Sequence, residues 1–252
     1  MTTAKKLNYI SIMGTMGSGK TTAARLIAQT LGYHLVEENF GENAFLPRFY
    51  KKMNRWAFHS QTFFLMEKIN QLMEIGENVS LRGTPTLRRE TKQSLLYGVT
   101  PTLNTVIPSG ARNPVRDRIS RITGIVQDTP IEQDVFSYAK AQHTLGNMDD
   151  AEWKLYRKIY ESFAPHLPKP DLIVYLKTSL PAVEKRIAGR GRGYEKKIPR
   201  NYLRLLEQLN EEWIVDHAPC RILTIETDGL NIVTSKNAQQ ELLTQVKKTL
   251  DR

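Results

Sequence analysis

The sequence has almost no cysteine and no long apolar stretch. Cys220 is the single cysteine among 252 residues, so no internal disulfide is possible. No run approaches the roughly 18 apolar residues of a membrane-spanning helix, and the N-terminal stretch MTTAKKLNYISIMG is too polar for a secretory signal. These absences predict a protein of the reducing cytoplasm that has no membrane partner.

Positive charge is in excess, but it is unevenly distributed. The formal net charge is +10, and a basic chain can indicate nucleic-acid binding. Residues 79–122 hold eight basic and two acidic side chains and therefore carry +6 of this total. The smaller excess on the rest of the chain suits a protein that handles polyphosphates. We therefore expect no nucleic-acid partner for the main body of the chain.

The same residues, 79–122, show no sustained hydrophobic period. They contain four prolines and the tetrapeptide TPTL twice, and about 40 residues without regular structure are unusual inside a compact domain. We predict that residues 1–252 form a single domain, interrupted by a disordered basic insertion at residues 79–122. The alternative is that this segment is a basic arm that binds a partner.

Short β-rich runs alternate with helical patterns along the rest of the chain. We expect strands at residues 9–13, 33–37, 125–127, 170–176 and 222–226. We expect helices at residues 20–31, 43–75, 131–145, 150–165, 181–188, 202–213 and 237–250. This order predicts an α/β fold, with a five-stranded parallel sheet and helices on both faces.

A glycine-rich turn joins the first predicted strand to the first predicted helix. Its residues fit the pattern G-x-x-x-x-G-K-[ST] in the context that the motif requires. They are Gly14, Thr15, Met16, Gly17, Ser18, Gly19, Lys20 and Thr21. Glycines let backbone N–H groups approach phosphate oxygens at a helix N-terminus, while Lys20 would reach the β- and γ-phosphates and the Thr21 hydroxyl a Mg²⁺ ion. The motif predicts binding of a nucleoside triphosphate and leaves the reaction open.

The segment after the second predicted strand resembles the deoxynucleoside kinases, which phosphorylate the 5′-hydroxyl of deoxynucleosides. Members of that family carry Glu-Pro-Val after this strand, then Asn-Pro-x-Leu-x-x-Phe-Tyr, then Trp-Ala-Phe and a glutamine. The matching residues here are Glu38, Asn43, Leu46, Phe49, Tyr50, Trp56, Ala57, Phe58 and Gln61. The chain departs from the pattern at Asn39 and Ala44, where prolines are usual.

The resemblance continues in the second half of the chain. A stretch similar to the family's lid, Arg-Ile-x-x-Arg-Gly-Arg-x-x-Glu, precedes an Ile-Pro-x-x-Tyr-Leu motif. The matching residues are Arg186, Ile187, Arg190, Gly191, Arg192 and Glu195, then Ile198, Pro199, Tyr202 and Leu203. The likeness covers about residues 7–78 and 123–228 and skips the predicted insertion. It implies the three-layer fold of the P-loop kinases, with a lid, and a homodimer.

The resemblance implies that three kinds of group act on the phosphates and the reacting hydroxyl. Glu38 would be the general base that takes the proton from the 5′-hydroxyl. Arg190 and Arg192 would be catalytic lid residues that stabilise charge on the transferred group. Arg186 would contact the cofactor, and Asp128 would contact Mg²⁺ together with Thr21.

The resemblance also implies contacts to the deoxynucleoside. Gln61 would read the edge of the base with its amide. Tyr50 and Glu195 would hold the 3′-hydroxyl of the sugar. Trp56 would form a wall of the base pocket, although an aromatic residue at helical spacing can equally belong to the core.

The residues after Asp128 depart from the family pattern. The family has an arginine and a serine there, and the arginine steadies the catalytic glutamate. This chain has Thr129 and Pro130. Asp134 matches a further family acid that points at the base, and Lys68 stands where several relatives have an arginine beside that acid. Both are therefore expected at the substrate.

Glu38 consequently lacks the arginine that the family places beside it. If a positive group is needed there, Lys20, Arg48 and the lid arginines are the candidates that the sequence offers.

Together these features favour an ATP-dependent deoxynucleoside kinase of nucleotide salvage, with ATP and Mg²⁺ as cofactors. The preferred base would carry an amino group. Two alternatives stay open. A catalytically weak or silent nucleotide-binding relative would fit the missing arginine at position 129. A nucleoside-monophosphate kinase such as thymidylate kinase shares the cradle and the lid, but it would need arginines for the acceptor phosphate near residues 128–130.

Overall fold

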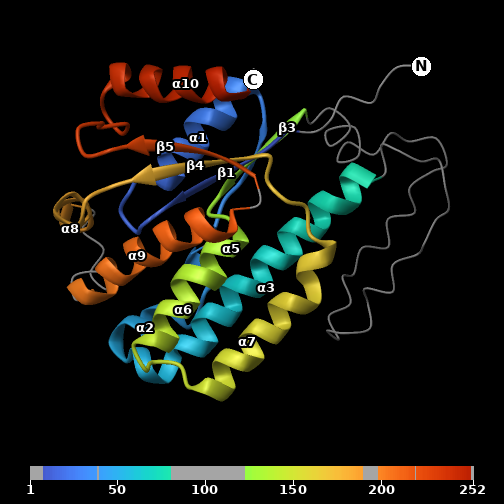
Figure 1. Ribbon diagram of the computed structural model, residues 1–252, viewed down its shortest axis with the longest axis vertical. Coiled ribbons are helices and arrows are strands. Elements are labelled where there is room, and N and C mark those ends of the chain that lie inside the picture. Colours follow the sequence, from blue (N-terminus) through green and yellow to red (C-terminus); the bar gives the residue numbers. More distant parts are fainter. Residues whose placement is uncertain (1–7, 39, 81–122, 190–197, 219, 251–252) are drawn as a thin grey trace.

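The computed structural model describes residues 8–38, 40–80, 123–189, 198–218 and 220–250. Its centre is a sheet of five strands in the order β2-β3-β1-β4-β5 (Figure 1), and every neighbouring pair is parallel. The strands are β1 (Asn8–Gly14), β2 (His34–Val36), β3 (Gly124–Asp128), β4 (Leu172–Lys177) and β5 (Arg221–Glu226). The predicted five-stranded parallel sheet is confirmed.

Helices cover both faces of this sheet, as predicted (Figure 1). On one face lie α1 (Lys20–Leu31) and α10 (Lys236–Leu250). The other face is covered by α3 (Met53–Ser80), α5 (Ile131–Gln133), α6 (Lys140–Thr144), α7 (Asp150–Phe163) and α9 (Arg200–His217). Helix α2 (Leu46–Lys51) packs on α3. The described chain also contains α8 (Leu180–Gly189) and the 3₁₀ turns η1 (Phe40–Glu42) and η4 (Ala164–His166).

The central strand β4 shows why its sequence is nearly all apolar. Leu172, Val174 and Leu176 pack into the core beneath α1 and α10. Ile173 and Tyr175 point to the opposite face, where they pack with Trp213 of α9. A strand whose side chains alternate between two buried faces has no position left for a polar residue.

The strand order reverses at β1, which lies between β3 and β4. In open α/β sheets, ligands bind at the carboxyl ends of the strands where the order reverses. The glycine-rich turn follows β1, Asp128 ends β3, and Glu38 comes two residues after β2. The topology therefore brings these three predicted site elements to one edge of the sheet.

The helical pattern predicted for residues 43–75 is two helices. The chain leaves helical geometry at Lys52, where φ is −149° and ψ is 80°, and α3 then continues to Ser80. Residues 79 and 80, placed in the insertion by the sequence, are thus helical. Residues 81–122 lie outside the described residues, so the disordered insertion and the alternative partner-binding arm stay predictions.

The run predicted as one helix at residues 131–145 contains a π-helical segment. This segment, η3 (Asp134–Ala139), connects α5 to α6 without a break in the chain's helical course. Single π turns inside helices are rare and often occur at functional sites.

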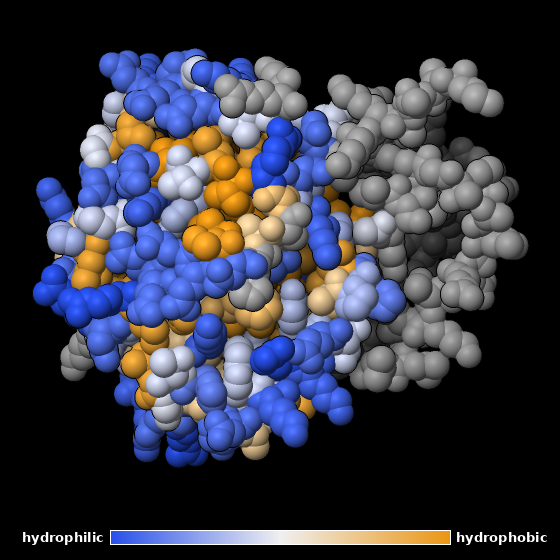
Figure 2. All heavy atoms as spheres, in the orientation of Figure 1, coloured by the Kyte–Doolittle hydropathy of each residue, from blue (hydrophilic) through white to orange (hydrophobic). Residues whose placement is uncertain are grey.

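None of the helices in the described ranges has the length and apolar character needed to cross a membrane. The face of the molecule shown in Figure 2 is covered mostly by hydrophilic residues, with smaller hydrophobic areas between them.

Candidate active site

The glycine-rich turn between β1 and α1 has a backbone that requires glycine. Gly17 and Gly19 have φ values of 87° and 103°, in the left-handed region that disfavours residues with a Cβ atom. A Cβ atom on Gly14 would lie 2.5 Å from Ser18 Oγ and 2.9 Å from the Leu176 carbonyl oxygen. The turn thus forms a tight cradle that leads directly into the N-terminus of α1.

The polar groups of this cradle suit a phosphate. Lys20 Nζ donates to the Gly14 carbonyl oxygen at 2.8 Å and to Tyr138 Oη at 3.2 Å. Ser18 Oγ is buried and has no hydrogen-bond partner within the described part of the chain. Backbone N–H groups, an ammonium group and a buried hydroxyl at a helix N-terminus fit the oxygens of a polyphosphate.

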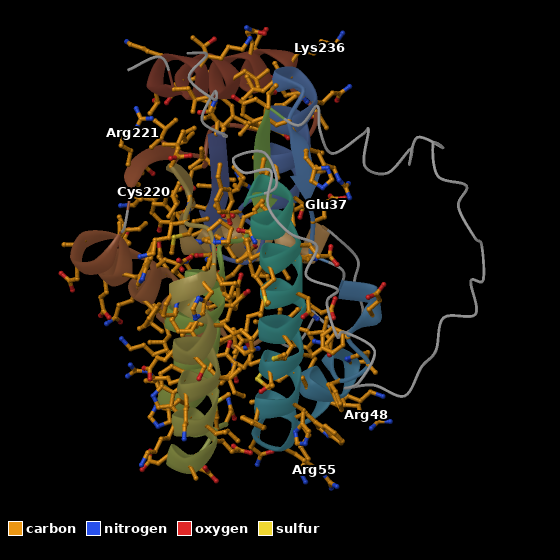
Figure 3. All side chains as sticks on the ribbon, turned by 90° about the vertical axis from the view of Figure 1, so that its right-hand side faces the viewer. Glu37, Arg48, Arg55, Cys220, Arg221 and Lys236 are labelled. Atoms are coloured by element: carbon orange, nitrogen blue, oxygen red, sulfur yellow. The ribbon has the colours of Figure 1, made fainter. Side chains whose placement is uncertain are left out.

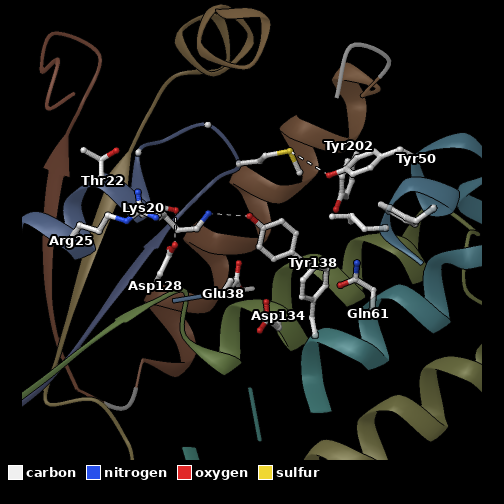
Figure 4. A pocket seen from close by; sticks show the side chains of 17 residues that line it. Lys20, Thr22, Arg25, Glu38, Tyr50, Gln61, Asp128, Asp134, Tyr138 and Tyr202 are labelled. Carbon is white, nitrogen blue, oxygen red and sulfur yellow. Dashed lines mark hydrogen bonds between the residues drawn. The ribbon is translucent and has the colours of Figure 1, made fainter. Parts of the chain in front are cut away.

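Thr21 and Asp128 lie beside the cradle and form a pair of oxygen ligands. Thr21 Oγ1 donates to Asp128 Oδ2 at 2.6 Å (Figure 4). Ile12 of β1 is the register partner of Asp128 in β3, which places the carboxylate next to the start of α1. A hydroxyl and one carboxylate are the protein ligands that Mg²⁺ uses when phosphates and waters supply the rest. These residues therefore fit the predicted metal role.

Glu38 lines the cavity that opens beside the cradle. Its carboxylate is nearly buried and accepts a hydrogen bond from Lys68 Nζ at 2.8 Å. Burial raises the pKa of Glu38, while the charge of Lys68 acts in the opposite direction. A carboxylate with a raised pKa at the wall of a cavity has the properties of a general base.

The cavity has a volume of about 410 Å³ and continues from the cradle towards α3 (Figure 4). Its far end combines aromatic and aliphatic walls with a few polar groups, which is the usual composition of a small-molecule site. The residues at this end are Leu46, Phe49, Tyr50, Gln61, Phe64, Asp134, Tyr138 and Tyr202.

Asp134 brings a buried carboxyl group to this end of the cavity. Burial raises its pKa to about 7, while Lys68, 3.6 Å away, acts to lower it. Its Oδ2 atom makes no hydrogen bond to any described residue. Because Asp134 lines the cavity, its carboxyl group suits a ligand that carries N–H donors.

The structure brings together most of the predicted site residues. Gly17, Gly19, Lys20, Thr21, Glu38, Tyr50, Gln61, Asp128 and Asp134 all line the one cavity. Tyr50 also lies close to the cradle, since its hydroxyl is 3.7 Å from Met16 Sδ. Arg190, Arg192 and Glu195 lie outside the described residues, so their predicted roles stay predictions.

Arg186 and Trp56 lie elsewhere. Arg186 Nη1 donates to the Ser18 carbonyl oxygen at 3.2 Å and to Thr227 Oγ1 at 3.1 Å, so its guanidinium group connects the cradle to the residue that follows β5. Trp56 is not among the described residues that line the cavity. Its ring stacks on Phe45 at 5.9 Å, and Arg48 lies over it at 5.1 Å.

Arg48 belongs to an exterior corner of the molecule. Figure 3 places Arg48 and Arg55 near the start of α3, at the opposite end of the molecule from Lys236. Both guanidinium groups lie over the Trp56 ring. Arg48 therefore does not supply the positive charge next to Glu38 for which the sequence made it a candidate.

Comparison with known proteins now decides the family. A sequence model of the deoxynucleoside kinase family matches residues 10–88 and 112–251. The chain belongs to the deoxynucleoside kinase family. The match leaves out residues 89–111, which lie within the segment predicted to be an insertion.

Individual members of this family are similar to the chain over nearly its full length. A deoxyguanosine kinase of Bacillus subtilis is 27% identical over 249 residues, which is 96% of this chain and 97% of the relative. A deoxyadenosine/deoxycytidine kinase of the same organism is 26% identical over 243 residues, covering 96% and 92%.

Solved structures of the family share the fold. A deoxyadenosine kinase from M. mycoides with bound dCTP superposes with a TM-score of 0.67 at 19% identity, covering 96% of this chain and 98% of the other. The same kinase with bound dATP gives a TM-score of 0.67 at 20% identity, covering 97% and 100%. The predicted P-loop kinase fold is thereby confirmed.

Several residues at or beside the cavity were not predicted from the sequence. Tyr138 lines the cavity and contacts Lys20; its position four residues after Asp134, on the same helical face, would have indicated it. Gln133 Nε2 donates to the Gly14 carbonyl oxygen at 2.8 Å and to Asn210 Oδ1 at 3.0 Å. No spacing signal connects Gln133 with Asn210, because they are 77 residues apart.

Proposed function

We propose that the protein transfers the γ-phosphoryl group of ATP to the 5′-hydroxyl of a deoxynucleoside, in nucleotide salvage. One observation carries this proposal. Glu38, a buried carboxylate suited to proton abstraction, lines the same cavity as the phosphate cradle and as the polar groups of Gln61 and Asp134. A donor site and an acceptor site that share one cavity meet the geometric need of phosphoryl transfer.

The residues divide the work along the cavity. Lys20 and the backbone of the cradle would hold the β- and γ-phosphates, and Thr21 with Asp128 would hold Mg²⁺. Bound Mg-ATP supplies the phosphoryl group and the metal offsets its negative charge. Glu38 would accept the proton of the 5′-hydroxyl, and Tyr50 would hold the sugar.

Gln61 and Asp134 would face the base. Gln61 offers one donor and one acceptor side by side, and Asp134 brings an accepting carboxyl group to the wall of the cavity. Such a pair favours a base with an amino group. The names of the similar proteins support this, because deoxyadenosine, deoxycytidine and deoxyguanosine all carry amino-bearing bases.

The test is a direct assay of the purified protein with Mg-ATP and each of the four deoxynucleosides, followed by the four monophosphates. We expect a monophosphate product from at least one amino-bearing deoxynucleoside. Glu38→Gln should lower kcat by about 10²–10⁴-fold, the usual contribution of a general base. Glu37→Gln is the matched control, since that neighbouring carboxylate pairs with Arg25 on the surface at 2.5 Å.

Two results would contradict the proposal. ATP binding without turnover on any acceptor would identify a silent nucleotide-binding relative. Turnover on monophosphates alone would identify a nucleoside-monophosphate kinase. We also propose that the protein is a homodimer, as the resemblance implies, and light scattering after size-exclusion chromatography would measure this.

A further inference from the structure

Lys68 is a buried lysine in the middle of α3. It is 2% exposed, and lysines are almost never so deeply buried unless they are paired. Burial alone would lower its pKa, but the carboxylates of Glu38 and Asp134 outweigh this effect and raise it. Lys68 is therefore a buried cation that is paired with the carboxylates of Glu38 and Asp134.

The ammonium group of Lys68 has as many close acceptors as it has hydrogens. Nζ donates to Glu38 Oε1 at 2.8 Å, to the Thr129 carbonyl oxygen at 2.8 Å and to the Asp128 carbonyl oxygen at 3.3 Å. An ammonium group has three donors. Asp134 Oδ2, at 3.6 Å, adds an ion pair without a hydrogen bond. No donor is left over for a nucleobase.

The position of Lys68 also argues against a contact with a nucleobase. Glu38 and Asp134 line the cavity, and their carboxylates face it in Figure 4. Lys68 is not among the described residues of the cavity wall. Lys68 thus contacts the two acids on the side that faces away from the cavity.

The backbone at Thr129 is bent in a way that serves this contact. Thr129 has a φ value of 74°, in the left-handed region that β-branched residues avoid. Its N–H donates to the Ile12 carbonyl oxygen at 3.0 Å and its side chain is fully buried, so the conformation is held from several sides. The bend directs two consecutive carbonyl oxygens, of Asp128 and Thr129, at one ammonium group.

We infer that Lys68 is a positioning residue: it orients the carboxylate of Glu38 for proton abstraction and does not read the base. The inference rests on the proposed function of Glu38. It also explains how the site tolerates threonine after Asp128, where the resemblance implies an arginine beside the glutamate. In this chain the positive charge comes from α3, and the carbonyl groups of the bend anchor it.

The test compares the kinetics of Lys68→Met with those of the unaltered protein. A positioning residue predicts that kcat falls by about 10²-fold or more, while KM for the deoxynucleoside and the order of preference among bases stay nearly unchanged. Lys68→Arg keeps the charge and should recover part of kcat. Gln71→Leu is the matched control, because Gln71 lies one turn along α3 and donates to the Glu37 carbonyl oxygen at 3.2 Å; its kcat should stay close to the original.

A second pair of variants guards against loss of folding. Lys68→Met together with Asp134→Asn removes one buried acid along with the lysine, and its kcat is compared with that of Asp134→Asn alone. The kcat of the double variant should be lower than that of Asp134→Asn by the same factor as Lys68→Met lowers the kcat of the unaltered protein. Thr129→Arg should not raise kcat, because the position beside Glu38 is already occupied by a cation.

Three outcomes would overturn the inference. One is a raised KM or an altered base preference with an unchanged kcat in Lys68→Met, which would make the lysine a base contact. Another is an unchanged kcat per folded molecule, which would reduce its role to stability. The third is a sharp rise in kcat in Thr129→Arg. Failure of the proposed function looks different, since the unaltered protein would then show no turnover of deoxynucleosides at all.

Discussion

Asp134 illustrates how burial and charge act on one side chain of the cavity. It is 4% exposed, and burial raises its pKa to about 7 against the partly compensating charge of Lys68. A carboxyl group whose pKa is raised by folding binds its proton more tightly in the folded state. Its stabilising contribution is therefore complete below the unfolded value of about 3.9 and is lost as the pH rises towards the folded value.

The raised pKa of Asp134 predicts that Asp134→Asn changes how the stability of the protein depends on pH. Between about pH 4 and about pH 7, the free energy of unfolding of the unaltered protein should fall with rising pH, with up to about 1.4 kcal/mol per pH unit from this one group. The asparagine variant should lose that part of the slope. Chemical denaturation across this range would measure it, with the exposed Asp216→Asn as control. An identical slope in the Asp134 variant would disprove the assignment.

At the scale of elements, a buried amide connects three segments beneath the phosphate cradle. Gln133, the last residue of α5, donates to the carbonyl oxygen of Gly14 at 2.8 Å and accepts from its N–H at 3.3 Å. It also donates to Asn210 of α9, whose amide reaches Thr15 Oγ1 at 3.4 Å. The cradle thus depends on two helices that are remote from it in the sequence.

Gln133→Leu should remove this brace while keeping the volume of the side chain. It removes the hydrogen-bond partner of the buried Gly14 N–H and of Asn210 Oδ1, and a buried group left unsatisfied typically costs about 1–3 kcal/mol. We expect KM for ATP to rise more than KM for the deoxynucleoside. Gln142→Leu is the control, because Gln142 is equally buried but pairs with Asn147. Equal rises of KM for ATP in both variants would count against the brace.

Local signals in the sequence predicted the elements that carry the cradle. The bounds expected for α1 agree with those observed, because glycines with φ values of 103° and 65° enclose it at positions 19 and 32. The break between α2 and α3 at Lys52 has no proline or glycine to mark it and could not be predicted. The contacts of Lys68 with the carbonyl groups after β3 depend on a backbone bend at a threonine, which residue type alone would argue against.

At the scale of the whole molecule, the family match leaves out one segment in the middle of the chain. Residues 89–111 are unmatched, whereas the described lining of the cavity comes from the cradle, from α1, α2, α3, η3 and α9, from Glu38 after β2 and from Asp128 at the end of β3. Because the family does not share this segment, we predict that residues 89–111 are dispensable for folding and for the site.

Replacing residues 89–111 by a short Gly/Ser linker should consequently preserve folding and ATP binding. At an ATP concentration about 100 times Kd, binding should stabilise both the shortened and the unaltered protein by about 2.7 kcal/mol. This corresponds to a rise in Tm on the order of 5–10 °C. Thermal denaturation with and without Mg-ATP would measure this, and Lys20→Ala should abolish the shift in both backgrounds. Loss of the folded state in the shortened protein would refute the prediction that this segment is dispensable.

The contact between Lys68 and the Thr129 carbonyl joins positions 61 residues apart, and it has a consequence for sequence change among relatives. Arginine introduced at 129 would bury a second cation beside the first, and an uncharged residue at 68 would leave two carbonyl groups and two acids uncompensated. Neither position can change freely without the other. In a deep alignment of the family we therefore expect the two columns to covary, with threonine, asparagine or glycine at 129 accompanied by lysine at 68.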